Sequence, residues 1–144
     1  MLYTYFTEKL LGLEEVIVKN IEQNENSTNI FIEIILKEHC CPSCGCTTKK
    51  VHDYRTQKIK DTSAFNKNVY LFLRKRRYIC PHCGKRFYEN VSFLPRFHRM
   101  TSRLVEYIIE SVACECSFTS VAKRVNLSTS TVMRIFDCIN YGNP

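Results

Sequence analysis

Hydrophobic and polar residues follow two local patterns in the first quarter of the chain. An apolar-rich segment at residues 3–11 predicts a short helix that ends near Gly12. Residues 15–21 and 30–36 are rich in β-branched and apolar residues, and the polar run at residues 23–29 lies between them. The sequence therefore predicts an N-terminal helix followed by a β-hairpin.

A second pair of strand-like segments covers residues 51–60 and 67–79, with a polar turn near Thr62 and Asn66 between them. An antiparallel hairpin runs out and back, so its two ends meet again. Strands of about ten residues, at roughly 3.3 Å per residue, would make a ribbon on the order of 30 Å long. The second of these strands is apolar at first and ends in a basic run at residues 74–77.

In the last third of the chain, the spacing of apolar residues is that of an amphipathic helix. Thr101 is a candidate N-cap for a helix whose apolar residues recur three and four positions apart. Ser117 is the corresponding N-cap for a helix over residues 118–125, and Ser128 for one that runs from residue 129 to about 139. This part of the sequence predicts a three-helix unit.

The last two of these helices satisfy the spatial pattern of a helix-turn-helix. Val121 and Val125 provide an apolar face, and Ala122 is small where the next helix crosses closely. Asn126 tolerates the left-handed backbone conformation that the turn requires, and Leu127 fills the core. A plain helical hairpin needs the apolar period but not these other features. Together with the positive charge, the pattern favours a DNA-binding helix-turn-helix.

In this geometry the N-terminal part of the second helix enters the major groove of DNA. Arg134 is the best candidate for a contact with guanine O6 and N7 or with a phosphate. Lys123 and Arg124 are expected at the DNA backbone, where they add affinity without reading the sequence. The other candidate DNA-contacting residues of this motif are Ser128, Thr129, Ser130 and Thr131.

Two pentapeptides, Cys41–Gly45 and Cys80–Gly84, both read Cys-Pro-x-Cys-Gly. The C-x-x-C spacing lets two thiolates point at one ion, and the glycine permits a positive φ after the turn. Two such knuckles, brought together by the ribbon, supply the four ligands of one tetrahedral structural zinc ion and leave no open position for water. The expected ligands are Cys41, Cys44, Cys80 and Cys83.

The other cysteines are interpreted as free thiols. Cys40 is the one plausible substitute ligand, but it lacks the spacing that Cys41 has. An odd total of nine cysteines, at knuckle spacing and without an export signal, indicates a reduced cytoplasmic protein rather than a disulfide-bonded secreted one.

Charge is distributed unevenly along the 144 residues, whose net charge is +7. Residues 1–38 hold three lysines and seven glutamates, a net charge of −4, and residues 39–144 carry +11. This asymmetry favours a polyanionic partner. A zinc tetrathiolate carries −2, however, and itself attracts nearby cations. The basic run could therefore bind phosphates, neutralise the thiolates, or do both. It comprises Arg74, Lys75, Arg76 and Arg77.

The expected fold class is α+β, with an N-terminal β-hairpin and a zinc β-ribbon followed by a three-helix helix-turn-helix domain. The expected domains are residues 1–38 (helix and hairpin), 39–95 (zinc ribbon) and 96–144 (helix-turn-helix). No run of about eighteen apolar residues predicts a membrane span. The sequence contains no recognisable catalytic constellation or phosphate-binding loop.

Four sequence stretches precede the helix-turn-helix in an order that is more specific than the paired knuckles alone. They are His52–Arg55, Arg76–Cys83, Arg86–Glu89 and Arg99–Leu104. In this order the chain resembles the N-terminal region of bacterial insertion-sequence transposases of the ISL-three type. The resemblance implies that the zinc module and the helix-turn-helix recognise the terminal inverted repeats of the element. It also implies a following RNase H-like catalytic domain with a carboxylate triad. Because the sequence stops at Pro144, we expect a fragment or truncated copy that binds DNA but does not cut it.

Two other functions remain open on the sequence alone. One is a stand-alone transcriptional regulator built from a zinc ribbon and a helix-turn-helix, and the other is a zinc-stabilised protein-interaction module. For the leading hypothesis the expected partner is double-stranded DNA in the nucleoid of a bacterial cytoplasm, with no membrane partner. The oligomeric state is open, with a homodimer among the alternatives.

Overall fold

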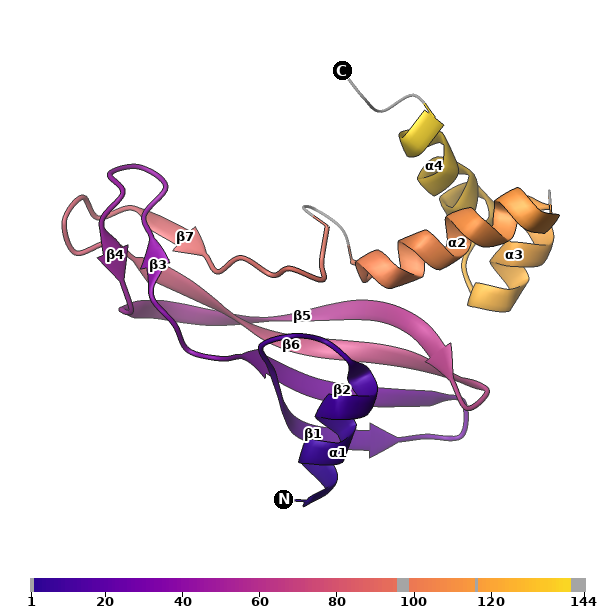
Figure 1. The fold of residues 1–144 in the computed structure, drawn as a ribbon, viewed down its shortest axis with the longest axis horizontal. Coiled ribbons are helices and arrows are strands. Elements are labelled where there is room, and N and C mark those ends of the chain that lie inside the picture. The colour runs from indigo at the N-terminus through magenta and orange to yellow at the C-terminus, as the bar shows by residue number, and fades with distance from the viewer. Residues whose placement is uncertain (1, 96–98, 116, 141–144) are drawn as a thin grey trace.

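The two predicted hairpins form one continuous sheet that runs the length of the molecule (Figure 1). The computed structural model describes residues 2–95, 99–115 and 117–140. The strands of the sheet are β1 (Val16–Gln23), β2 (Ser27–Ile34), β5 (Val51–Ala64), β6 (Lys67–Ile79) and β7 (Arg86–Tyr88). Their order is β1-β2-β6-β5, with β7 beside β6. The predicted mixed α+β class is confirmed.

A parallel pairing between β2 and β6 joins the two hairpins, and the sequence pattern did not predict it. The pairing runs from Ser27 opposite Asn68 to Ile32 opposite Leu73. It gives β6 a neighbour on both edges, because β5 pairs antiparallel with the other edge. The long ribbon therefore does not project freely, and strands on both sides of residue 38 belong to the same sheet.

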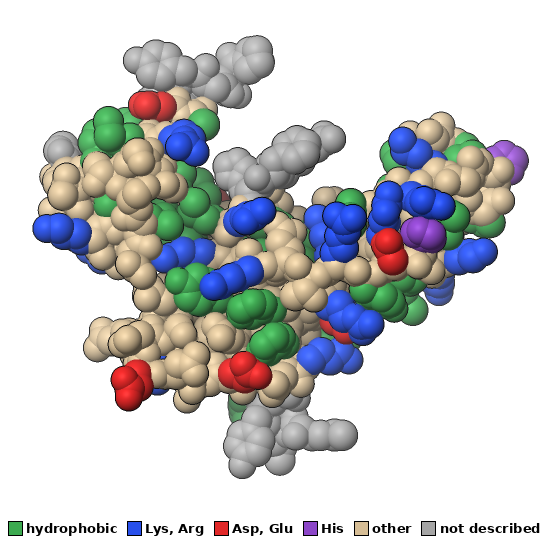
Figure 2. Space-filling view, turned by 180° about the vertical axis from the view of Figure 1, so that it is seen from behind, with side chains coloured by type: hydrophobic (Ala, Val, Ile, Leu, Met, Phe, Trp, Pro, Cys, Tyr) green, Lys and Arg blue, Asp and Glu red, His purple; other side chains and the backbone are tan. Residues whose placement is uncertain are grey.

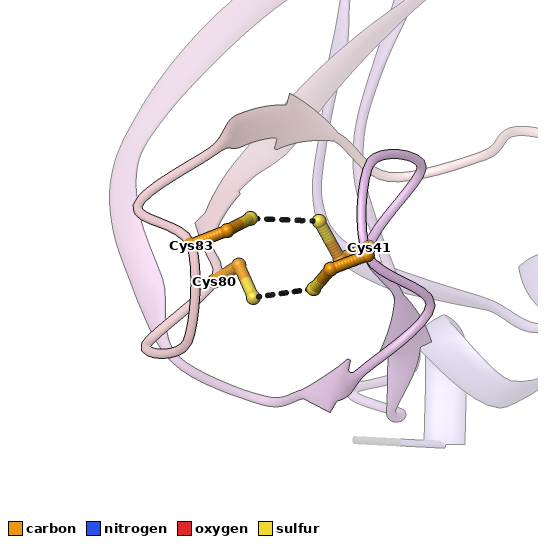
Figure 3. A group of neighbouring side chains, drawn as sticks. Cys41, Cys80 and Cys83 are labelled. Carbon is orange, nitrogen blue, oxygen red and sulfur yellow. Dashed lines mark hydrogen bonds between the residues drawn. The ribbon is translucent and has the colours of Figure 1, made fainter.

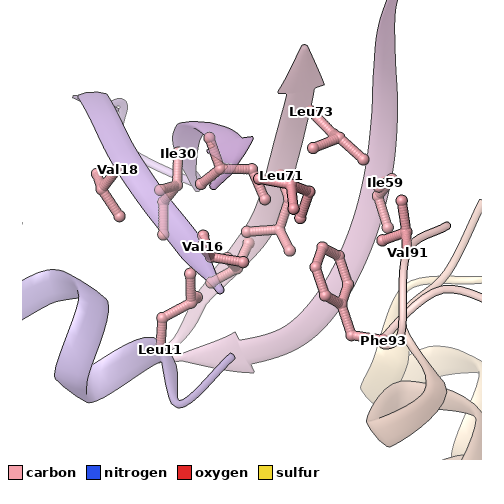
Figure 4. Packing of buried hydrophobic residues seen from close by; sticks show 12 residues of the cluster. Leu11, Val16, Val18, Ile30, Ile59, Leu71, Leu73, Val91 and Phe93 are labelled. Atoms are coloured by element: carbon pink, nitrogen blue, oxygen red, sulfur yellow. The ribbon is translucent and has the colours of Figure 1, made fainter. Parts of the chain in front are cut away.

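One face of this sheet carries the main hydrophobic core (Figure 4). Alternate residues of each strand reach that face, as the period of two along a strand requires. Helix α1 (Leu2–Leu11) contributes Leu11 to the core, and the chain after β7 contributes Val91 and Phe93. The strand residues of the core include Val16, Val18, Ile30, Ile32, Ile59, Leu71 and Leu73.

The opposite face mixes aromatic and basic side chains. Phe31 and Phe72 stack across β2 and β6 with their ring centroids 5.0 Å apart. Lys58 lies over the ring of Tyr70, with Nζ 4.3 Å from the centroid. Figure 2, which shows the molecule from behind, has basic side chains interleaved with hydrophobic ones across its middle.

Three helices near the C-terminus form a second hydrophobic core. They are α2 (Ser102–Glu115), α3 (Phe118–Val125) and α4 (Thr129–Asn140), and with α1 they make four helices in the described part of the chain. Their core consists of Leu104, Ile108, Val112, Val121, Ala122, Val125, Val132 and Ile135. None of the helices among the described residues is long and apolar enough to cross a membrane.

Local signals in the sequence place the ends of these helices correctly. Ser117 is the N-cap of α3, and its hydroxyl accepts a hydrogen bond from the backbone N–H of Ser120 at 3.3 Å. Thr101 does the same for α2, since its Oγ1 accepts from the N–H of Leu104 at 3.3 Å. Asn126 ends α3 in the left-handed conformation, with φ 56° and ψ 52°.

The three-helix unit is attached to the free edge of β5. The backbone N–H of Lys60 donates to the carbonyl of Arg99, and the N–H of Thr101 donates to the carbonyl of Lys60. The side chain of Lys60 reaches further and donates to the carbonyl of Asn126 at 2.8 Å, in the turn of the helix-turn-helix. Figure 1 accordingly shows α3 near one end of the sheet, and the short strands β3 (His39–Cys40) and β4 (Thr47–Thr48) at the other.

Replacing Asn126 should show how much the turn depends on a left-handed residue. We expect Asn126→Val to destabilise the protein by about 1–2 kcal/mol, because a Cβ is disfavoured in this conformation. Asn126→Gly should be tolerated, since glycine adopts a positive φ freely. The measurement is the Tm of thermal unfolding, with Ser120→Val on the exposed surface of α3 as a control for adding a β-branched residue. Equal Tm values for the two Asn126 variants would contradict the expectation.

Candidate metal centre and nucleic-acid interface

The two Cys-Pro-x-Cys-Gly segments form the same turn. One lies between β3 (His39–Cys40) and β4 (Thr47–Thr48), and the other lies between β6 and β7. In each, the N–H of the first cysteine donates to a carbonyl five residues later, at 2.8 Å for Cys41 and 2.9 Å for Cys80. In each, the glycine N–H donates back to the first cysteine carbonyl at 2.9 Å. Gly45 and Gly84 have φ values of 77° and 74°, so both turns use the conformational freedom of glycine.

The structure brings the four predicted ligands together (Figure 3). The Sγ atoms of Cys41, Cys44, Cys80 and Cys83 all lie within 4.8 Å of one another. Cys41 and Cys83 approach to 3.5 Å, and so do Cys44 and Cys80. A tetrahedral zinc ion with Zn–S bonds of about 2.3 Å requires sulfurs roughly 3.8 Å apart, so the cluster fits this ion. In the described part of the chain it is the one group of three or more such residues that could hold a metal, and Cys40 lies outside it.

The thiols of this cluster do not ionise alike. Burial opposes ionisation of Cys41, but hydrogen bonds from the backbone of Cys44 and Ser43 outweigh it and lower the pKa to about 7. At Cys44 a backbone hydrogen bond from Cys46 favours the thiolate, yet desolvation and the adjacent thiols raise the pKa overall. Like charges at such short range oppose one another. Four adjacent thiolates therefore need a cation to stabilise them together.

Arg76 requires a correction to the predicted basic run. Its side chain is buried, with 7% of the residue exposed. The guanidinium donates to the carbonyl of Ile34 and lies 3.4 Å from a carboxylate oxygen of Glu33 and 3.5 Å from one of Glu89. These partners hold Arg76 inside the protein, so it does not face DNA.

The other three residues of the basic run lie at the surface with partners of their own. Arg74 pairs with Glu33 at 3.2 Å, and its guanidinium lies 3.9 Å from the ring centroid of Tyr54. Arg77 pairs with Asp53 at 3.6 Å. Lys75 is half-buried, and burial lowers its pKa. These residues are accessible to a phosphate, although two of them are partly neutralised.

The N-terminal half of α4 presents small polar groups. Ser128 caps the helix, because its Oγ accepts from the N–H of Thr131 at 3.2 Å and lies 2.7 Å from the hydroxyl oxygen of the same residue. Ser130 and Arg134 are exposed, and Thr129 and Thr131 are partly exposed. Sequence reasoning missed Met133, which is 44% exposed one helical turn after Thr129. Its position four residues after a predicted contact could have revealed it.

Lys123 and Arg124 are exposed at the end of α3, as a DNA-backbone role requires. Arg124 forms an ion pair with Glu115, and hydrogen bonds to Tyr107 and Glu115 raise its pKa. Both residues line a groove of about 720 Å³ whose other wall is the β5–β6 turn, with Asn66 among its residues. The sequence did not indicate that this turn lies beside the helix-turn-helix.

Comparison with known proteins agrees with this geometry. Residues 37–83 match the family described as zinc-finger of transposase IS204/IS1001/IS1096/IS1165. Residues 89–139 match the helix-turn-helix domain of transposase family ISL3. A transposase for insertion sequence element IS1001, from Bordetella parapertussis, is 28% identical over 109 residues. That match covers 74% of this chain and 27% of the relative.

No solved structure matches the chain. The zinc-finger match, taken with the four-cysteine cluster, makes the metal a structural zinc ion. The two matched segments also follow each other in the order expected from the sequence. The chain thus carries a zinc-finger segment and a helix-turn-helix segment that both match ISL3-type transposases.

Proposed function

We propose that this region recognises the terminal inverted repeats of an insertion sequence as double-stranded DNA. The observation that supports this most is the exposed N-terminal half of α4, set by the left-handed turn at Asn126. A helix presented in this way can enter the major groove with its first turns. The family match to a transposase helix-turn-helix supports the same role.

The proposed contacts divide into base and backbone contacts. Arg134 reads a guanine through O6 and N7, and Met133 can pack against a thymine methyl group. Backbone contacts add affinity without sequence information. The proposed backbone contacts are Lys123, Arg124, Arg74, Lys75 and Arg77, and the hydroxyl groups of Ser128, Thr129, Ser130 and Thr131 contact either bases or phosphates.

The zinc ion has a structural role in this proposal. Cys41, Cys44, Cys80 and Cys83 would fill all four coordination positions, which leaves none for a reacting water. The zinc holds the ends of β6 and of the β3–β4 turn together. We infer that these residues bind DNA and do not cut it. We expect them to act at the nucleoid, in the bacterial cytoplasm, with a homodimer among the open oligomeric states.

Selection of bound sequences from a random pool of double-stranded DNA tests the proposal. We expect a consensus that resembles the ends of an insertion sequence. With about six phosphate contacts, affinity should fall on the order of a thousandfold between 50 and 200 mM salt. Arg134→Ala should weaken binding by about 1–3 kcal/mol, roughly five- to 150-fold, and relax the preference at one base pair.

Lys19→Ala, on the exposed surface of β1, is the matched control and should leave DNA affinity unchanged. A consensus unrelated to element ends would favour a transcriptional regulator. No enrichment, together with equal binding by wild type and Arg134→Ala, would favour a protein-interaction module.

A further inference from the structure

A pocket of about 390 Å³ lies beside β5, between the zinc knuckles and the three-helix unit. Its charged lining residues are Arg55 and Lys58 from β5, Lys75 from β6 and Arg99 from the chain before α2. Tyr88 of β7 forms part of the wall. Among the described residues that line it there is no carboxylate. We call this the cationic pocket.

Two of its cations lie directly opposite each other on neighbouring strands. Arg55 is directly opposite Lys75 in the β5–β6 pairing. Like charges in this position destabilise a sheet, because their Cβ atoms are only about 4.5–5.5 Å apart. The acids nearby have other partners: Glu89 is buried beside Arg76, and Asp53 pairs with Arg77. Neither facing cation forms an ion pair within the described part of the chain, although Glu89 interacts electrostatically with Lys75.

The other residues that line the pocket are also suited to binding an anion. Lys75 Nζ lies 5.3 Å from the ring centroid of Tyr88. The aromatic ring supports a half-buried ammonium group without neutralising it. Arg99 also lines the pocket and is exposed. Arginine and lysine together suit a phosphate group, through bidentate hydrogen bonds and a point charge respectively.

The position of the pocket connects it with the helix-turn-helix. Lys60 on the same strand contacts the carbonyl of Asn126 in the turn before α4. Arg55 precedes Lys60 by five residues, which is roughly 17 Å along a strand. One turn of duplex DNA spans about 34 Å, so a single DNA segment can contact both places.

We propose that the cationic pocket binds a backbone phosphate of the double-stranded DNA that the helix-turn-helix engages. This inference rests on the proposed DNA-binding function. It adds Arg55 and Arg99, which are not in the basic run, to the residues proposed to contact a DNA phosphate. It also explains why an unfavourable pair of like charges stands at this position of the sheet.

The test compares two double variants that remove the same amount of charge. Arg55→Ala/Arg99→Ala removes the two pocket cations that the basic run does not include, and Lys9→Ala/Lys19→Ala changes α1 and β1, at the opposite edge of the sheet from β5. We expect the pocket variant to bind DNA about tenfold more weakly or worse, alike for selected and unrelated sequences. Its salt slope should fall by about 1, as for one lost phosphate contact. Its Tm should not fall, because a repulsive pair has been removed.

Each contrary result identifies what failed. If the pocket variant keeps wild-type affinity and slope while Arg134→Ala weakens binding, the inference is wrong and the proposed function stands. If wild type shows no salt-dependent DNA binding, both are wrong. If inorganic phosphate raises the Tm of wild type but not of the pocket variant, and DNA binding is unchanged, the pocket serves a free anion and the inference is again overturned.

Discussion

Removal of zinc by a strong chelator is expected to unfold the two knuckles and the adjoining end of β6 first and to leave the three-helix unit folded. Structural zinc in small domains supplies about 10–16 kcal/mol of apparent binding free energy, which is comparable to the whole stability of a domain. The knuckles themselves bury little: Cys44, Gly45, Cys83 and Gly84 are all exposed. The helices α2, α3 and α4 have their own hydrophobic core and should persist.

Hydrogen exchange measured before and after chelation checks this expectation. Amides of β6 near Ile79 and of the two knuckles should lose protection, while amides of α3 such as Val121 should keep theirs. Cys80→Ser should reproduce the effect of chelation, because Cys80 is buried within the cluster. Cys40→Ser is the matched control, since Cys40 is exposed and outside the cluster. Uniform protection in all four samples would show that the metal does not hold this end of the sheet.

Asp61→Ala is expected to cost about 1–3 kcal/mol of stability, because buried donors lose their acceptor while the Arg103 side chain, 36% exposed, remains partly solvated. The Asp61 side chain is 1% exposed and forms an ion pair with Arg103. It accepts hydrogen bonds from Thr101 Oγ1 and from Arg103 Nε, each at 2.8 Å. Arg103 also donates to the carbonyl of Leu11. One carboxylate thus connects β5, the start of α2 and the end of α1.

The free energy of unfolding, from urea titration, is the quantity to compare. Asp53→Ala provides the control, because Asp53 pairs with Arg77 at 3.6 Å with 41% of its side chain exposed. Exposed pairs of this kind contribute about 0–1 kcal/mol. A loss for Asp61→Ala no larger than that for Asp53→Ala would mean that the network is dispensable.

Local geometry explains which features the sequence predicted. The knuckle turns and the caps at Ser117 and Asn126 depend on residues within five positions of one another, so the types and spacing of residues determine them. The four cysteines also followed from spacing, because an antiparallel ribbon returns to its starting point.

Non-local pairing explains what the sequence did not predict. Alternation along β2 and β6 indicates two strands, but it carries no information about which strands become neighbours. Arg76 was read as part of a uniform basic run, although it stands two residues before the buried Tyr78 and so shares its face of the strand. Asp61 likewise follows the buried Ile59 by two, a signal that this acid would need a buried partner. The partner, Arg103, is 42 residues away and could not be identified from the pattern.

The parallel pairing of β2 with β6 has a consequence for synthesis of the chain. Ser27 pairs with Asn68, about forty residues later, so β2 leaves the ribosome long before its second neighbour does. At about 5–20 residues per second this delay lasts on the order of 2–8 s. During that interval the nascent β1–β2 hairpin presents an unpaired apolar edge, which is a template for wrong pairing with other chains. The seven glutamates among the first 38 residues counteract such association, because they give every nascent chain the same negative charge.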